Sequence, residues 1–198
     1  MDNSFFRCIN RLANRTGWAH GIFTSYAKYG IVLFAVLLIV AYLDGRQHDD
    51  LRAVAGSVWA VGAALVALGI GQLIGGVIGG VIDRVIDRAR PYETMAGVQL
   101  LVDKTTDFSF PSDHATAAGA VAVGLVLTNR RWGIFAGVLA VVMAFTRVYV
   151  GAHYPADVLA GLALGGAVAA AGAVLVVPLL SRGVALLGRT KLRVLVLR

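Results

Sequence analysis

The chain has 198 residues, of which 58% are hydrophobic and only 15% charged, and its formal net charge is +7. Because a soluble domain normally carries about 25% charged residues, this composition excludes an ordinary soluble domain and predicts one helical membrane bundle. The positive charge suits contact with anionic lipid or an anionic substrate. We therefore expect membrane lipids rather than nucleic acid as partners, and we predict no particular oligomeric state.

Residues 1–22 are predicted to form an amphipathic helix that lies in the membrane interface. Its two faces are Phe5, Ile9 and Leu12 on one side and Arg7, Arg11 and Arg15 on the other. A solvated N-terminal helix is the alternative. Cys8 is the single cysteine, so no internal disulfide is possible. No cleavable signal peptide is expected, because the first long apolar run starts only near Gly30.

Residues 23–181 are predicted to form the membrane domain, an all-α bundle of five transmembrane helices. Each run is apolar over roughly the 20 residues that a crossing needs. The predicted spans are 24–43, 53–81, 112–129, 132–150 and 156–180. In the second span Gly71, Gly75 and Gly79 recur every four residues, which predicts close packing against a neighbouring helix.

Residues 182–198 carry several arginines and are predicted to form a basic cytoplasmic tail. With five spans, the loops 82–111 and 150–155 then lie on the opposite, extracytoplasmic side. The sequence therefore predicts a multi-pass protein of the cytoplasmic membrane, with the ends of spans two and four and the starts of three and five at its outer end.

Almost every polar residue near a predicted membrane boundary falls in one of three stretches at that end, 87–93, 110–114 and 146–157. Ionisable residues at such depth are costly and mark function by default. In the last stretch Pro155 fits the first turn of a helix, so His153 precedes the helix and Asp157 lies one turn in. That carboxylate can orient the imidazole, and Arg147 offers a planar donor for an oxyanion. The alternative is a snorkelling arginine and an interfacial histidine.

In the middle stretch, Ser112 fits a helix N-cap and Asp113 is favoured by the helix dipole. Neither role accounts for His114. The same helix start presents free backbone N–H groups that bind anions, so capping and phosphate binding are compatible interpretations.

The first stretch adds Arg88 and Arg90. The three stretches together supply two histidines, an orienting carboxylate, arginines and a helix N-terminus. Such a set is typical of a site for phosphoryl transfer. Zinc or magnesium bound by two histidines and two aspartates is the alternative. The neighbouring arginines argue against a dication and in favour of a phosphate.

These stretches resemble the signature of the type 2 phosphatidic acid phosphatase superfamily, membrane lipid phosphatases related to vanadium haloperoxidases. The resemblance covers roughly residues 24–180 and implies an acid phosphatase/haloperoxidase-like helical core. Its motifs, in order, are Arg90-Pro91, then Pro111-Ser112-x-His114, then Arg147-x5-His153-x3-Asp157.

The resemblance implies that His153 is the nucleophile and forms a phosphohistidine, that Asp157 orients it, and that His114 protonates the leaving group. It also implies a phosphate site and no metal or other cofactor. The residues that would hold phosphate are Arg90, Arg147 and Ser112, with the backbone N–H groups near 113–114.

The chain departs from the family pattern at three positions. Asp83 stands where many members have a lysine, with Arg84 and Arg88 nearby; Thr146 replaces a serine; and Asp113 replaces a glycine. The last change gives "FPSDH", which resembles the bacitracin-resistance branch, the BcrC-type undecaprenyl-pyrophosphate phosphatases.

That branch implies removal of the terminal phosphate from a polyprenyl pyrophosphate, which recycles the lipid carrier of cell-wall synthesis. The alternatives are a phosphatase for phosphatidylglycerophosphate or phosphatidate, or a non-catalytic scaffold or transport protein. A diphosphate needs extra positive charge, which Arg84, Arg88 and Lys104 can supply. We count Arg88 and Asp113 with the phosphate site, and expect Asp113 to orient His114 or an arginine rather than to touch phosphate.

Overall fold

The structure, a computed structural model, describes residues 2–78 and 88–198. All regular structure within these residues is helical, which confirms the predicted all-α class. The helices, in chain order, are α1 (Asp2–Arg15), the 3-10 turn η1 (Gly17–Ala19), α2 (His20–Gln47), α3 (Leu51–Gln72), the π-helical segment η2 (Leu73–Ile78), α4 (Pro91–Thr94), α5 (Asp113–Thr128), α6 (Arg130–Tyr149), α7 (Pro155–Leu175), α8 (Val177–Leu187) and α9 (Arg193–Val196).

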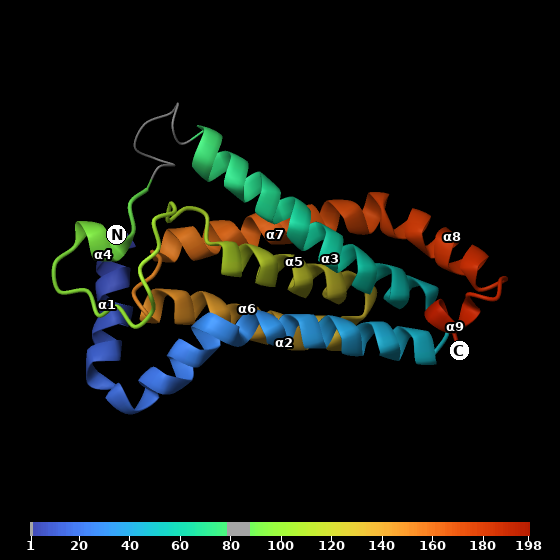
Figure 1. Ribbon diagram of the computed structural model, residues 1–198, viewed down its shortest axis with the longest axis horizontal. Helices are drawn as coiled ribbons and strands as arrows, with labels where there is room; N and C mark the ends of the chain where they lie inside the picture. The colour runs from blue at the N-terminus through green and yellow to red at the C-terminus, as the bar shows by residue number, and fades with distance from the viewer. Residues whose placement is uncertain (1, 79–87) are drawn as a thin grey trace.

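The long helices run along one common axis, and α5 lies at the centre of the bundle (Figure 1). It packs against α3, α6 and α7, and almost all of its residues from Ala115 to Leu125 are buried. The alanines and glycines of this helix make that possible, because small side chains let neighbouring backbones approach closely in lipid.

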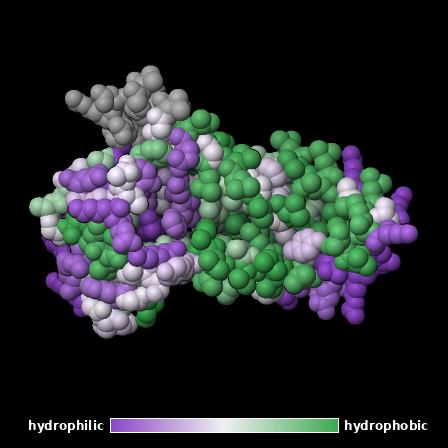
Figure 2. Space-filling view, in the orientation of Figure 1, coloured by the Kyte–Doolittle hydropathy of each residue, from purple (hydrophilic) through white to green (hydrophobic). Residues whose placement is uncertain are grey.

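Four helical stretches, 17–47, 51–76, 130–149 and 155–175, are long and apolar enough to cross a bilayer. Helix α5, with 16 residues, is about 24 Å long at 1.5 Å per residue, shorter than the roughly 30 Å hydrocarbon layer. The predicted count of five crossings therefore stays a prediction. The space-filling view shows an apolar band across the middle of the molecule and hydrophilic residues at both ends (Figure 2).

The predicted fifth span, 156–180, is divided between two helices. α7 ends at Leu175 and α8 starts at Val177, next to Pro178, whose missing N–H and ring interrupt helical hydrogen bonding. Within α8, Val177 and Val184 pack against Val54 of α3. The predicted boundary between the membrane domain and the basic tail thus falls inside a packed helix.

Helix α1 lies across the left end of the bundle in Figure 1. The face that it packs against the protein contains Phe6, Asn10 and Ala13. The predicted apolar face lies beside that one, and Phe5 and Leu12 remain 64% and 43% exposed. Insertion of this exposed apolar face into the membrane interface stays a prediction.

Glycines set the closest approaches in the bundle. A Cβ on Gly165 of α7 would lie 2.0 Å from the backbone oxygen of Thr116 in α5. In the predicted glycine stripe of span two, Gly75 packs against the segment before α5, since a Cβ there would lie 2.0 Å from the ring of Phe108. A Cβ on Gly71 would lie 3.3 Å from Pro111 and 3.8 Å from Leu164 of α7. Gly79, the last glycine of that stripe, lies outside the described residues.

Candidate active site

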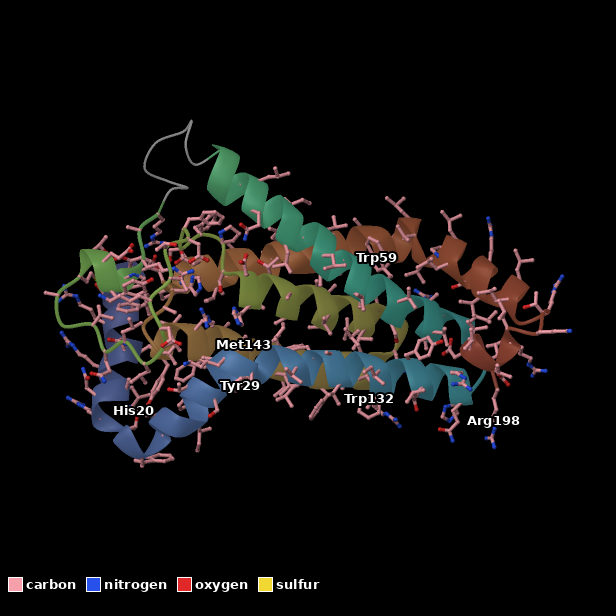
Figure 3. All side chains as sticks on the ribbon, in the orientation of Figure 1. His20, Tyr29, Trp59, Trp132, Met143 and Arg198 are labelled. Carbon is pink, nitrogen blue, oxygen red and sulfur yellow. The ribbon has the colours of Figure 1, made fainter. Side chains whose placement is uncertain are left out.

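The structure brings the three predicted polar stretches together at one end of the bundle. The loop before α4, the segment before α5 and the loop between α6 and α7 meet there, and polar side chains from all three converge (Figure 3). This arrangement follows from the up-and-down topology, because α3 and α6 run toward this end while α5 and α7 start from it.

His153 lies in the loop between α6 and α7 and is only 2% exposed. Its Nδ1 is 2.8 Å from the backbone oxygen of Ser109. Because a carbonyl oxygen only accepts, Nδ1 carries the proton and Nε2 is the unprotonated ring nitrogen, with a lone pair that can accept a hydrogen bond. Burial lowers the pKa of His153 well below its ordinary value of 6.5, and the charges of Arg147 and Arg90 lower it further. The imidazole is therefore neutral at neutral pH, as a nucleophile must be.

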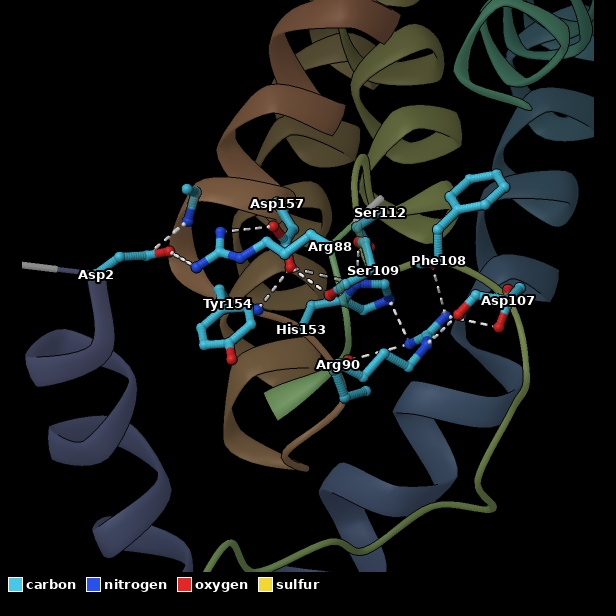
Figure 4. A network of polar contacts seen from close by, with 12 residues as sticks. Asp2, Arg88, Arg90, Asp107, Phe108, Ser109, Ser112, His153, Tyr154 and Asp157 are labelled. Carbon is cyan, nitrogen blue, oxygen red and sulfur yellow. Dashed lines mark hydrogen bonds and ion pairs between the residues drawn. The ribbon is translucent and has the colours of Figure 1, made fainter. Parts of the chain in front are cut away.

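Arg90 is fixed beside the His153 imidazole (Figure 4). Its Nη1 donates to His153 Nε2 at 3.2 Å and to the backbone oxygen of Ala152 at 3.0 Å. Its Nη2 donates to Asp107 Oδ1 at 3.0 Å. The guanidinium is thus held against Nε2, the ring nitrogen that the predicted role of His153 as nucleophile requires.

Asp157 is placed differently from the predicted direct contact with His153. Its Oδ2 is 3.9 Å from His153 Nδ1, which is beyond a hydrogen bond. That oxygen accepts instead from Ser109 Oγ at 2.5 Å and from the Tyr154 backbone N–H at 2.9 Å. Asp157 therefore reaches the imidazole through Ser109, whose carbonyl is the direct partner of Nδ1.

Three buried polar atoms of the site have no hydrogen-bond partner within residues 2–78 and 88–198: Ser112 Oγ, Thr146 Oγ1 and Arg147 Nε. Ser112 is fully buried and stands at the N-cap of α5, yet its side chain makes no capping bond there. Buried donors without partners are costly. Together with the free N–H groups at the start of α5, they form an environment suited to an oxyanion.

His114 lies in the first turn of α5 and is half-buried. Of the predicted site residues, Arg90 contacts the His153 imidazole directly, at 3.2 Å, and the electrostatic influence of Arg147, Arg90 and His114 lowers the pKa of that imidazole. The two predicted histidines and the two principal predicted arginines thus lie at the same end of the bundle, with Arg90 in direct contact with His153.

Within residues 2–78 and 88–198 the Asp113 carboxylate hydrogen-bonds to Gln72 and not to His114 or an arginine, so its expected orienting role stays a prediction. Its two carboxylate oxygens accept from Gln72 Nε2, at 3.2 and 3.0 Å. Gln72 is the last residue of α3, so Asp113 ties the start of α5 to the end of α3. Asp113 and His114 occupy successive positions of a helix, so their side chains point in different directions.

Arg88 also differs from its predicted role as a phosphate ligand. Its Nη1 donates to Asp157 Oδ1 at 3.0 Å and its Nη2 to Asp2 Oδ2 at 2.5 Å. The guanidinium also lies 3.6 Å above the centre of the Tyr154 ring. These contacts direct Arg88 toward the carboxylates behind His153. Asp83 and Arg84, the other residues near the absent lysine, lie outside the described residues.

The alternative metal site requires His114, His153, Asp113 and Asp157 around one point. The two carboxylates have other partners, since Asp157 is bound by Ser109 and Arg88 and Asp113 by Gln72. Among the described residues no three His, Cys, Asp or Glu side chains group closely enough to hold a metal ion.

Sequence reasoning missed Ser109, Gln72 and Asp2, each of which contacts a predicted site residue. Ser109 lies immediately before the stretch "FPSDH", and it belongs to none of the three motifs. No sequence pattern identified Gln72 or Asp2, because their partners are distant in the chain.

The sequence and the fold of this chain are similar to those of known phosphatases. The family model of the PAP2 superfamily matches residues 60–179. Undecaprenyl-diphosphatase BcrC of Bacillus subtilis is 29% identical over 162 residues, which cover 82% of this chain and 77% of BcrC. Lipid A 1-phosphatase of Rhizobium etli is 48% identical over 58 residues, 29% of this chain and 25% of that protein. The crystal structure of Aquifex aeolicus LpxE superposes with a TM-score of 0.60 at 22% identity and covers 86% of this chain and 93% of LpxE.

Proposed function

The chain belongs to the PAP2 superfamily, and from that premise we propose that this integral membrane protein hydrolyses a polyprenyl pyrophosphate to the monophosphate and inorganic phosphate. The observation that carries the proposal is a buried, neutral imidazole with its Nε2 lone pair facing Arg90, beside the unpartnered donors of Ser112 and Arg147.

The first step is attack on the terminal phosphorus. Nε2 of His153 forms the N–P bond while the bond from phosphorus to the bridging oxygen breaks. Arg90 and Arg147, with Ser112 and the N–H groups at the start of α5, stabilise the charge on the phosphoryl oxygens. His114 donates a proton to the departing polyprenyl phosphate, and its role is small because that leaving group is weakly basic.

The second step releases phosphate from the phosphohistidine. His114, now deprotonated, takes a proton from a water molecule, whose oxygen attacks phosphorus as the N–P bond breaks. The electron pair returns to Nε2 of His153. Because Ser109 keeps the proton on Nδ1 throughout, the same ring nitrogen serves as nucleophile and leaving group.

The preference for a pyrophosphate rests on similarity to BcrC over most of the chain. A second candidate is dephosphorylation of another lipid phosphate, which the higher local identity to lipid A 1-phosphatase favours. Both use the same site and differ in the leaving group. We further propose that the protein lies in a bacterial cytoplasmic membrane with this site on the extracytoplasmic side.

The test is phosphate release by the purified protein in detergent. The substrates are undecaprenyl pyrophosphate, phosphatidylglycerophosphate, phosphatidate and lipid A, each with and without a chelator. We expect fastest release from the pyrophosphate, no effect of chelator, and loss of at least about 1,000-fold in kcat for His153→Ala, because the nucleophile is removed. Equal activity of His153→Ala would refute the phosphohistidine, and faster release from lipid A would favour the second candidate.

A further inference from the structure

Asp2, at the start of the amphipathic helix α1, contacts the catalytic end of the bundle through both of its carboxylate oxygens. Oδ2 accepts from Arg88 Nη2 at 2.5 Å. Oδ1 accepts from the backbone N–H of Ala156 at 3.1 Å, in the first turn of α7, where N–H groups lack helical partners. One side chain thus connects α1, the segment that carries Arg88, and the helix that carries Asp157.

A continuous series of hydrogen bonds links Asp2 to His153 (Figure 4). Arg88 Nη1 binds Asp157 Oδ1 at 3.0 Å. Asp157 Oδ2 accepts from Ser109 Oγ at 2.5 Å, and the Ser109 carbonyl accepts from His153 Nδ1 at 2.8 Å. Asp2 stands at the far end of this series.

Arg88 needs a second acceptor to remain on Asp157. Its side chain is 26% exposed, whereas that of Asp157 is fully buried, and an arginine beside a phosphate site is attracted toward the anionic substrate. Asp2 binds the other edge of the guanidinium, and the Tyr154 ring supports its face at 3.6 Å. These contacts keep Arg88 turned toward Asp157, which would otherwise be a buried charge without its cationic partner.

Helix α1 is rigidly attached, so Asp2 is held in place. Phe6 is 1% exposed, with its ring centre 5.6 Å from that of Tyr154. The Asn10 side chain donates to the backbone oxygens of Gln99 and Tyr149, at 2.9 and 3.1 Å. A helix docked in this way presents its first carboxylate to Arg88 at a fixed position.

We propose that Asp2 is a positioning residue for the reaction. It holds Arg88 on Asp157 and so fixes Ser109 and the His153 ring, which makes α1 part of the active site as well as a surface helix. This inference rests on the proposed phosphatase function and assigns a role to a segment outside the matched residues 60–179.

The test compares Asp2→Asn with Asn3→Ala, an exposed neighbour in the same helix turn. On whichever lipid the wild type cleaves, we expect Asp2→Asn to lower kcat about ten- to a hundredfold with little change in KM, because a misplaced nucleophile slows chemistry more than binding. Asp2→Glu should recover part of the loss, and Asn3→Ala should match the wild type.

A double-mutant cycle tests the path. In an Arg88→Gln background, Asp2→Asn should cost nothing further, because the guanidinium partner is gone and an asparagine oxygen can still accept from the Ala156 N–H. Additive losses, or a wild-type kcat in Asp2→Asn, would overturn the inference.

NMR of 15N-histidine-labelled protein adds a readout that needs no substrate, with His153→Gln to assign the signal. Asp2→Asn should change the Nδ1 shift of His153, and Asn3→Ala should not. If the wild type releases phosphate from no lipid, the proposed function fails, and the Nδ1 shift of His153 then tests the role of Asp2 by itself. An unchanged shift in Asp2→Asn refutes that role, and a changed shift supports it.

Discussion

A backbone carbonyl, rather than a carboxylate, fixes the tautomer of His153. The Ser109 carbonyl accepts from Nδ1, while Asp157 holds the Ser109 hydroxyl and the N–H of Tyr154. The Asp157 carboxylate makes no hydrogen bond to the ring, and burial and the two arginines together favour the neutral form.

The lowered pKa of His153 predicts how stability depends on pH. The unfolded chain takes up a proton near the ordinary value of 6.5, whereas the folded ring resists it until lower pH. The free energy of unfolding should therefore fall as pH drops below that value toward the lowered pKa, and this loss should be absent above it. Thermal unfolding in detergent, followed at several pH values between about 7 and about 5, measures this loss of stability.

His153→Gln is the control, because glutamine does not titrate there. The melting temperature of the variant should fall less than that of the wild type over the same pH range. Parallel losses in the two proteins would contradict the assignment of a depressed pKa to this residue.

At the scale of elements, the centre of the bundle depends on glycines that allow α7 to lie directly against α5. A Cβ on Gly165 would meet the Thr116 oxygen at 2.0 Å and the Ala120 nitrogen at 2.7 Å. Both atoms belong to the backbone, so neither can rotate away. The helices must then separate, and Asp157 on α7 would move relative to Ser112, whose N–H donates to the Asp157 carbonyl at 3.1 Å.

Gly165→Ala should therefore destabilise the protein, by about 1–3 kcal/mol or more as for other overpacked cores, and should lower kcat as well. Gly137→Ala is the matched control, since a Cβ there meets nothing within 4 Å, and alanine is the better helix former. Melting temperatures in detergent and phosphate release check both variants. Equal melting temperatures would mean that α5 and α7 are less tightly packed than the structure describes.

At the scale of the whole molecule, the site, α1 and the α6–α7 loop lie at one end, whereas α8, α9 and the C-terminus lie at the other (Figure 1). The proposed orientation places the first end outside the cytoplasm. The single cysteine, Cys8, is exposed on α1 and reports on this directly.

A membrane-impermeant thiol reagent applied to intact cells should label Cys8. In a Cys8→Ser background, Arg189→Cys at the opposite, exposed end should be labelled only after the membrane is permeabilised. The reverse pattern would invert the orientation and place the reaction on the cytoplasmic side.

The sequence by itself determined that this chain is a membrane bundle with its candidate catalytic residues collected at one end. Those properties depend on the length of apolar runs and on where each run stops, which are local features of the chain. The pairing of His114 and His153 with Arg90 and Arg147 followed in the same way, because alternating helices bring every second helix end to one side.

Only the tertiary structure decided which atoms touch. Asp2 lies 86 residues from Arg88, Ser109 lies 48 from Asp157, and Gln72 lies 41 from Asp113. Such contacts depend on how the helices pack against one another, as where Gly165 of α7 lies directly against the Thr116 backbone of α5. The sequence therefore indicated Arg88 and Asp113 only as residues of the phosphate site. Their actual partners, Asp157 for Arg88 and Gln72 for Asp113, became visible only in the folded chain.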